Sequence, residues 1–191
     1  MNWLTHLLIF LFKNYGSMTD GDLAKKVRGE AEDIAKRVVK KWFETDDFYK
    51  QGQGTPHIVF QYLDYLLWNI DQKQKFKFTF RNSVEHWYPQ NPSGFEPWEA
   101  KDRFGNLCIM SGSVNSKFSN LPPIGKKEYK ELISKGSLKL RKMADTTTNN
   151  EDWRESSCKK HEKYMINLLR ENLYPNGDNP ETLQKYFSEE R

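Results

Sequence analysis

The sequence predicts a mostly helical α+β protein arranged around one strand–loop–strand–helix segment. Apolar residues recur every three or four positions over residues 20–43 and 57–71, which is typical of helices. Short apolar runs then begin at Ser83 and at Leu107, and a Gly-Ser pair ends the second run before a further helical turn. We therefore expect a helical N-terminal segment, residues 1–74, followed by a unit with the strands and the C-terminal helices, residues 75–191.

The composition is that of a globular chain and argues against the membrane and disordered classes. Of the 191 residues, 29% are charged and 37% are hydrophobic. The net charge of +4 is compatible with a polyanionic partner but does not establish one. The two cysteines, Cys108 and Cys158, lack the spacing of a structural zinc site. Two buried thiols in a reducing cytosol are favoured over a disulfide, so we expect a cytoplasmic protein.

Three helical pieces are expected in the N-terminal half. The apolar run over residues 2–12 is shorter than the roughly 20 residues of a membrane span and is interpreted as a buried packing segment. Cap residues precede a helix from Asp20 to Phe43, and Thr55 with Pro56 starts a helix that should be central to the fold. The apolar face of the first of these two helices is assigned to Leu23, Val27, Ala31, Ile34, Val38 and Trp42.

Further elements flank the central segment. Phe76, Phe78 and Phe80 alternate with polar residues, which predicts a strand with one aromatic face. Residues 145–152 are polar and are interpreted as a mobile loop. A long helix from about Asp152 should bury Trp153, Cys158, Tyr164, Met165, Leu168 and Leu169, and Asn179-Pro180 should start a last short helix.

The bends of the central segment carry residues suited to phosphodiester hydrolysis. This reaction needs a base for water and a cation for the charge on the leaving oxygen. His86 suits the base, because an imidazole titrates near pH ~6.5. Glu85 and Asn115 suit a hard divalent ion such as Mg²⁺, and the Asn106 amide could pin the loop that carries His86. Taken singly, these residues have simpler interpretations, such as a half-buried histidine or a Gly-Asn turn.

Together the motif pieces resemble the His-Me-finger (HNH) nuclease motif, in the form carried by the C-terminal domain of GmrSD-type restriction endonucleases. The resemblance covers roughly residues 76–129 and implies a ββα-metal (His-Me finger) hairpin–helix core. It implies that His86 is the general base, that Glu85 and Asn115 hold one Mg²⁺ or Mn²⁺ ion, and that Asn106 is an orienting group of the catalytic site. The matching pieces are Glu85-His86-Trp87-Tyr88-Pro89-Gln90, Gly105-Asn106-Leu107, Asn115-Ser116-Lys117-Phe118-Ser119-Asn120, and Lys127 with Tyr129.

Lysines close to this segment are candidate phosphate contacts. Such contacts position a nucleic acid without reading its bases. A solvated helix start explains the same residues about equally well. The candidates are Lys117, Lys126, Lys127 and Lys130.

The function that the resemblance implies is a metal-dependent endonuclease that hydrolyses DNA, in prokaryotic or phage-related defence. Two alternatives stay open: a non-catalytic nucleic-acid-binding or assembly module of the same fold, and an RNase. The chain has no GxxxxGK[ST] phosphate loop. The resemblance implies a larger nucleotide-handling domain or subunit as a possible partner, and no membrane association is expected.

Overall fold

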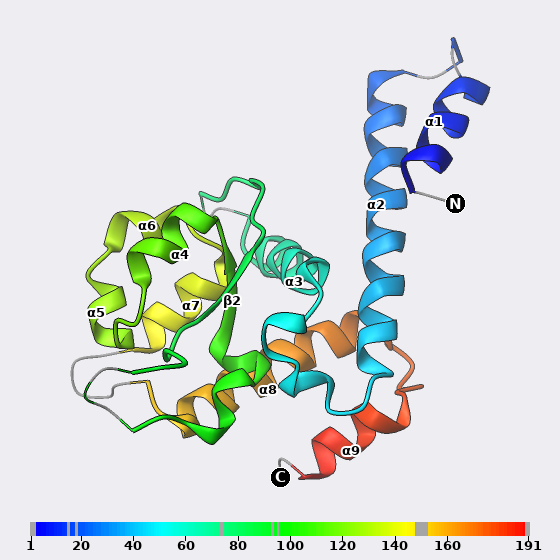
Figure 1. Cartoon of the computed structure of the whole chain (residues 1–191). Helices are drawn as coiled ribbons and strands as arrows, with labels where there is room; N and C mark the ends of the chain where they lie inside the picture. The colour runs from blue at the N-terminus through cyan, green and yellow to red at the C-terminus, as the bar shows by residue number, and fades with distance from the viewer. Residues whose placement is uncertain are drawn as a thin grey trace.

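The chain is mostly helical and carries one small antiparallel sheet (Figure 1). This computed structural model describes residues 3–14, 16–17, 19–72, 75–92, 94, 96–147 and 153–189. Strand β1 (Ser83–His86) pairs with β2 (Leu107–Met110) so that Ser83 lies opposite Met110 and His86 opposite Leu107. The predicted α+β class is therefore confirmed.

Helices make up most of the remaining described chain. Their bounds are α1 (Trp3–Asn14), α2 (Asp20–Phe43), α3 (His57–Ile70), α4 (Gly112–Phe118), α5 (Pro123–Lys127), α6 (Lys130–Ser134), α7 (Leu138–Thr146), α8 (Glu155–Leu173) and α9 (Glu181–Glu189). Four short 3₁₀ turns join them: η1 (Phe48–Lys50), η2 (Gly52–Gly54), η3 (Glu99–Asp102) and η4 (Phe104–Asn106).

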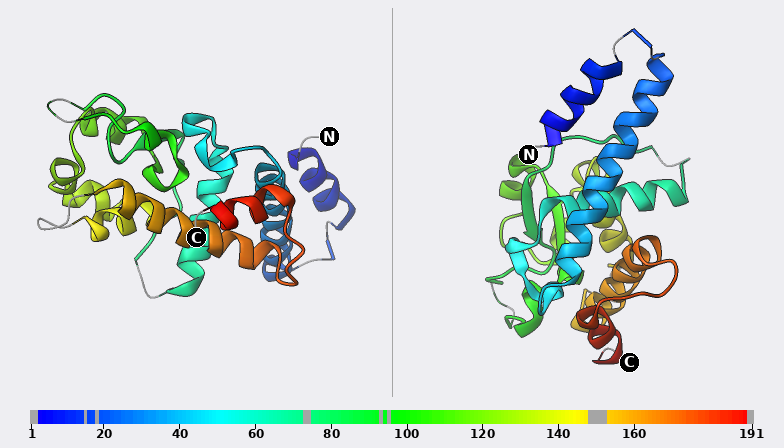
Figure 2. Two further views of the ribbon diagram at one scale, coloured as in Figure 1. Left: turned by 90° about the horizontal axis from the view of Figure 1, so that it is seen from below. Right: turned by 90° about the vertical axis from the view of Figure 1, so that its right-hand side faces the viewer.

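Helix α2 has the predicted bounds, and its start is fixed by a capping box. The Thr19 hydroxyl accepts a hydrogen bond from the Asp22 backbone, while the Asp22 carboxylate accepts one from the Thr19 backbone. The predicted apolar face is shifted, because of its members only Trp42 is buried, together with Ala35, Val39 and Phe43. The reason is that α1 and the first half of α2 extend away from the rest of the molecule (Figure 1 and Figure 2), so the first half of α2 has little to pack against.

Helix α1 does not form the buried packing segment that we expected, as far as its side chains are described. Leu8 is 56% exposed and Phe12 is 88% exposed. Over the described residues, none of the helices combines the length and the apolar character that crossing a bilayer requires.

The sheet is buried on both faces between two apolar clusters. Val84 and Ile109 face the larger cluster, which also contains the buried side of the central helix α3 and residues of α2, α8 and α9. Cys108 and Met110 face a second cluster formed with Trp87, the α4 and α7 helices and Trp153. This burial on both faces explains why β2 is continuously apolar instead of alternating.

The segment before β1 is extended but is not the predicted strand. Residues 75–82 have no strand assignment, and the sheet contains only β1 and β2 among the described residues. A period-two pattern describes alternating side chains, but a strand also needs a partner backbone. Within the described part of the chain, no backbone pairs with Phe76, Phe78 or Phe80. Phe76 instead packs edge-on against Phe78, with ring centroids 4.8 Å apart.

The C-terminal helices α8 and α9 follow the prediction with one exception. Trp153, Cys158, Met165 and Leu169 are buried and Leu168 is partly buried against the core, whereas Tyr164 is 49% exposed and is not a core residue. Both cysteines are free and buried, as expected. Of the predicted loop at 145–152, residues 145–146 still belong to α7, and the stretch from 148 to 152 lies outside the described residues.

Candidate functional site

A pocket of about 150 Å³ lies where β1 ends beside α4. The strand places Glu85 and His86 on opposite faces, yet both line this pocket because β1 stops at His86 and the chain turns toward Pro89. Asn115 reaches the same pocket from α4. The remaining lining residues are Gln53, Pro89, Gln90, Asn91, Ser119 and Asn120. Three of the predicted site residues are therefore neighbours in space.

His86 is held by a carboxylate. Its Nε2 atom lies 2.8 Å from Oδ1 of Asp102, and its side chain is 3% exposed. A carboxylate only accepts hydrogen bonds, so we assign the proton of the neutral ring to Nε2 and the lone pair to Nδ1. The Gln90 amide nitrogen lies 3.4 Å from the same Nε2, a longer contact that does not change this assignment. Burial lowers the pKa of His86 below 6.5, and the Asp102 carboxylate opposes that shift.

The approach of Asp102 depends on a glycine from the N-terminal half. Gly52 has a φ of +55°, and a Cβ atom built there would lie 2.8 Å from the Asp102 carboxylate oxygen. Only glycine adopts this backbone conformation without strain and leaves room for the carboxylate. Position 52 therefore belongs to the support of His86, although it lies far from the motif in sequence.

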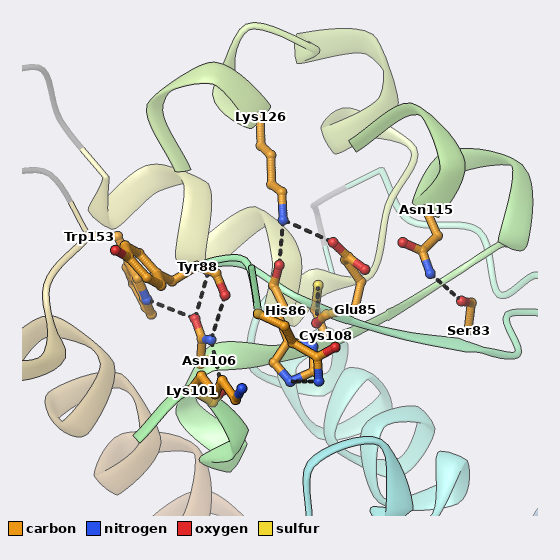
Figure 3. Close-up of polar contacts among 11 residues, drawn as sticks. Ser83, Glu85, His86, Tyr88, Lys101, Asn106, Cys108, Asn115, Lys126 and Trp153 are labelled. Atoms are coloured by element: carbon orange, nitrogen blue, oxygen red, sulfur yellow. Dashed lines mark hydrogen bonds and ion pairs between the residues drawn. The ribbon is translucent and has the colours of Figure 1, made fainter. Parts of the chain in front are cut away.

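Glu85 is paired with a buried lysine. Lys126 on α5 is fully buried and places its ammonium 2.9 Å from Oε1 of Glu85 and 2.5 Å from the backbone oxygen of His86 (Figure 3). Burial lowers the pKa of Lys126, and the Glu85 carboxylate opposes that shift. The pair fixes the end of β1 and neutralises one side of the carboxylate, which leaves Oε2 available to the pocket.

Asn115 is oriented by the other end of the same strand. Its amide nitrogen donates to the Ser83 hydroxyl at 2.7 Å (Figure 3). Because the amide nitrogen is used in that bond, the amide oxygen is left to bind a ligand in the pocket. Ser119, one turn later, has a φ of +42°, an unusual value for a residue with a side chain, and it lines the same pocket.

Asn106 is completely engaged in holding the loop after β1. Its oxygen accepts from the Tyr88 backbone at 2.8 Å and from the Trp153 indole at 3.2 Å. Its nitrogen donates to the backbone oxygens of Tyr88 and Lys101, each at 2.9 Å (Figure 3). An asparagine amide has two donor hydrogens and one acceptor oxygen, all used here. Asn106 therefore acts as a clamp on the backbone, and it is fully buried and absent from the pocket lining.

The four candidate lysines do not share one surface. Lys126 differs most from expectation, because it is buried in the ion pair with Glu85 and is not placed to meet solvent or a phosphate. Lys127 donates to the Thr147 backbone oxygen and lines a groove together with Lys130. Lys117 is exposed on α4.

The pocket contains a donor set that fits a magnesium-type ion. Mg²⁺ binds through one or two carboxylates and otherwise keeps waters or takes substrate phosphates. One carboxylate, Glu85, and one amide oxygen, Asn115, converge on the pocket. In the described part of the chain, no group of three or more His, Cys, Asp or Glu residues is arranged for a metal. The arrangement thus suits an ion completed by water and substrate better than a site made wholly of protein ligands.

Sequence reasoning did not identify the partners of the predicted residues. Asp102 lies 16 positions after His86, and Lys126 lies 41 positions after Glu85. Both lie near the motif, but nothing in their spacing pairs them with a particular side chain. Gln53 comes from the helical N-terminal half and carried no signal.

Comparison with known families places this geometry in context. Residues 33–168 match the family model described as GmrSD restriction endonucleases, C-terminal domain. Comparison with curated proteins and comparison with solved structures find no match. The matched range includes the pocket, its supporting residues and most of the fold from the middle of α2 to α8. The chain therefore belongs to the C-terminal domain family of the GmrSD restriction endonucleases, and its role is that of a restriction-endonuclease-like nuclease.

Proposed function

We propose that the chain is a metal-dependent endonuclease of the HNH type that hydrolyses DNA phosphodiester bonds, with the segment from β1 to α4 as a ββα-metal core. The observation that carries the proposal is the convergence of Glu85, His86 and Asn115 on one pocket. Family membership supports the nuclease role, and a part in prokaryotic or phage-related defence belongs to the proposal.

The chain supplies the base through His86. The neutral ring, protonated on Nε2 and held by Asp102, has its lone pair on Nδ1 for the proton of the attacking water. Burial lowers the pKa of His86, which favours the neutral ring that a base requires. Asp102 also stabilises the imidazolium that forms when the proton is taken, which is the role of the carboxylate in a histidine–aspartate pair.

Glu85 and Asn115 would hold one Mg²⁺ or Mn²⁺ ion beside this base. When bound, the ion supplies positive charge for the oxygens of the scissile phosphate. Lys126 keeps the Glu85 carboxylate in place from behind, and Ser83 does the same for the Asn115 amide. Asn106 keeps the turn after His86 rigid through its bonds to Tyr88.

The experiment that tests the function is nicking of supercoiled plasmid by the purified chain with Mg²⁺, with Mn²⁺ and with EDTA. We expect cutting with either metal and none with EDTA. Parallel assays on an RNA of the same sequence separate the DNase from the RNase. Retention of DNA without cutting under every metal condition would support the non-catalytic binding module instead. Adding a nucleotide-handling partner domain tests whether activity depends on it.

The Asn115→Ala variant is expected to need more metal for the same rate. It removes one oxygen ligand and leaves Glu85, so the metal concentration for half-maximal cleavage should rise about 10- to 100-fold. The measurement is a Mg²⁺ titration of the cleavage rate. Ser116→Ala on the same helix is the matched control, because the Ser116 hydroxyl bonds only to the Gly112 backbone oxygen in the described structure. Equal metal requirements in wild type and Asn115→Ala would remove Asn115 from the metal site.

The Asp102→Asn variant is expected to change both the rate and its pH dependence. Asp102 raises the pKa of His86, so its loss should lower that pKa further and move the acidic limb of the cleavage profile to lower pH. The plateau rate should fall about 10- to 100-fold, because the imidazolium loses its partner. A purely structural role would lower the rate without moving the limb. The wild-type limb itself should lie below pH 6.5.

A further inference from the structure

We propose that residues 75–81, together with the basic groove beside them, bind a single-stranded stretch of the substrate nucleic acid next to the pocket. We define the basic groove by Lys75, Lys127, Lys130, Lys135 and Arg141. The inference deepens the proposed endonuclease function, because it assigns the path and the strandedness of the substrate.

The extended segment presents aromatic rings that the protein core does not cover. Phe78 is 52% exposed and Phe80 is 82% exposed, although phenylalanine is among the residues most often buried. Phe78 touches Trp68 and Phe76 at its edges, whereas Phe80 makes no ring contact within the described part of the chain. Lys77 and Thr79 alternate with these rings and are exposed as well. A row of open aromatic faces between cations is the arrangement that binds unpaired bases.

The groove supplies the complementary charge. Two adjoining hollows of about 570 and 560 Å³ share Lys75, Ser134 and Arg141, so they form one continuous depression. Among the described residues that line it, Asp145 is the only acid. Such an excess of cations along a depression follows a phosphate backbone.

Arg141, a residue of the basic groove, contacts the start of the aromatic segment. Its guanidinium donates to the Lys75 backbone oxygen at 2.9 Å and lies 5.3 Å from the centroid of the Phe76 ring. The groove therefore adjoins the aromatic segment at Phe76, whose ring also contacts Phe78, while Phe78 itself lines a neighbouring apolar pocket with residues of α2 and α3.

The surface leads to the candidate site. Phe80 precedes Ser83 by three residues, and the Ser83 hydroxyl accepts the hydrogen bond from Asn115 at the pocket. Three extended residues span about 10 Å, which is about three stacked nucleotides. A nucleic-acid strand bound at Phe80 can therefore extend to the pocket while it stays in contact with the protein surface.

The exposed aromatic rings indicate that the bound nucleic acid is single-stranded. In a duplex the base faces are already stacked on one another, so Phe78 and Phe80 have nothing to stack on. A single strand offers its bases to the rings and its phosphates to the lysines at the same time. We therefore expect the chain to bind a single strand more tightly than the duplex of the same sequence.

The test is fluorescence anisotropy with a labelled single-stranded oligonucleotide and the matching duplex, in EDTA so that no cleavage occurs. Phe80→Ala should weaken single-strand binding about 5- to 100-fold and leave duplex binding nearly unchanged. Lys130→Gln and Lys135→Gln should weaken binding of both and reduce the salt dependence of log K by about 0.7 for each lost phosphate contact on the single strand. Phe12→Ala is the matched control, since Phe12 is equally exposed but lies on α1.

The outcomes are separable from those of the cleavage assay. Equal affinity for single strand and duplex, or a Phe80→Ala effect no larger than that of Phe12→Ala, would overturn the inference, and the exposed rings would then belong to a protein contact. If the binding pattern holds while no metal supports cutting, with or without the nucleotide-handling partner domain, the endonuclease proposal fails and this surface stands. If cutting is observed but Phe80→Ala binds and cuts a single strand like wild type, the surface fails and the endonuclease stands.

Discussion

Replacing His86 with alanine is expected to abolish most of the cleavage activity, with a loss of about 10²- to 10⁴-fold in rate. The ring is the neutral base beside the candidate metal ligands, and no other histidine lines the pocket among the described residues. The measurement is the rate of plasmid nicking under saturating Mg²⁺. Because the ring is deeply buried, the variant leaves a hole beside Asp102, whose side chain is 42% exposed and can be solvated.

Two further variants separate loss of the base from loss of the fold. His57→Ala is the matched control, because His57 is exposed at the start of α3, outside the pocket. His86→Gln keeps a polar side chain for Asp102 while removing the base, so it should retain the fold and still fail to cut. Circular dichroism confirms folding in each case. Cleavage by a folded His86→Gln variant at the wild-type rate would show that the base lies elsewhere.

The Glu162→Ala variant is expected to lower the free energy of unfolding by about 3–5 kcal/mol, the usual effect of leaving one member of a buried ion pair alone. Glu162 on α8 is fully buried and accepts from Arg103 at 2.5 and 3.1 Å. It also accepts from the Gly105 backbone at 2.9 Å and from the Tyr186 hydroxyl at 3.2 Å. Burial raises the pKa of Glu162, and the Arg103 guanidinium opposes the shift.

The Glu162→Ala variant should loosen the candidate site as well as destabilise the core. Gly105 precedes Asn106, so releasing its backbone loosens the clamp on the turn after His86. The measurement is urea unfolding of wild type, Glu162→Ala and Glu155→Ala. Glu155 is the control on the same helix, because its pair with Lys159 is exposed and spans 3.5 Å, which contributes at most about 1 kcal/mol. An unfolding free energy for Glu162→Ala within 1 kcal/mol of wild type would contradict the predicted cost of the unpaired Arg103.

The sequence predicted those features that depend on local pattern and turn chemistry. The bounds of α2 follow from its capping residues, and β2 follows from an apolar run between a Gly-Asn pair and a Gly-Ser pair. The predicted strand over Phe76, Phe78 and Phe80 was wrong for a physical reason. Period two reports where side chains point, whereas a strand is made by hydrogen bonds to a partner that the local sequence does not contain.

The partners in the candidate site illustrate the same limit. Glu85, His86 and Asn115 were found from chemistry and spacing, and the structure brings them to one pocket. The pairing of His86 with Asp102 and of Glu85 with Lys126 depends on how η3 and α5 pack against β1, and charge alone does not select one partner among 26 acids and 30 basic residues. Packing also decided the buried face of α2, since only its second half reaches the body of the molecule.

The glycine at position 52 sets a rule for exchanging parts between members of this family. A chimaera that joins residues 1–74 of one relative to residues 75–191 of another would keep every motif residue from Glu85 to Asn120. It would nevertheless lose the histidine–aspartate contact if the donated half carried any side chain at the position of Gly52, because that atom meets the Asp102 carboxylate. The first half of the chain is therefore not an interchangeable scaffold, and a functional graft must carry the 52–102 contact as one inherited unit.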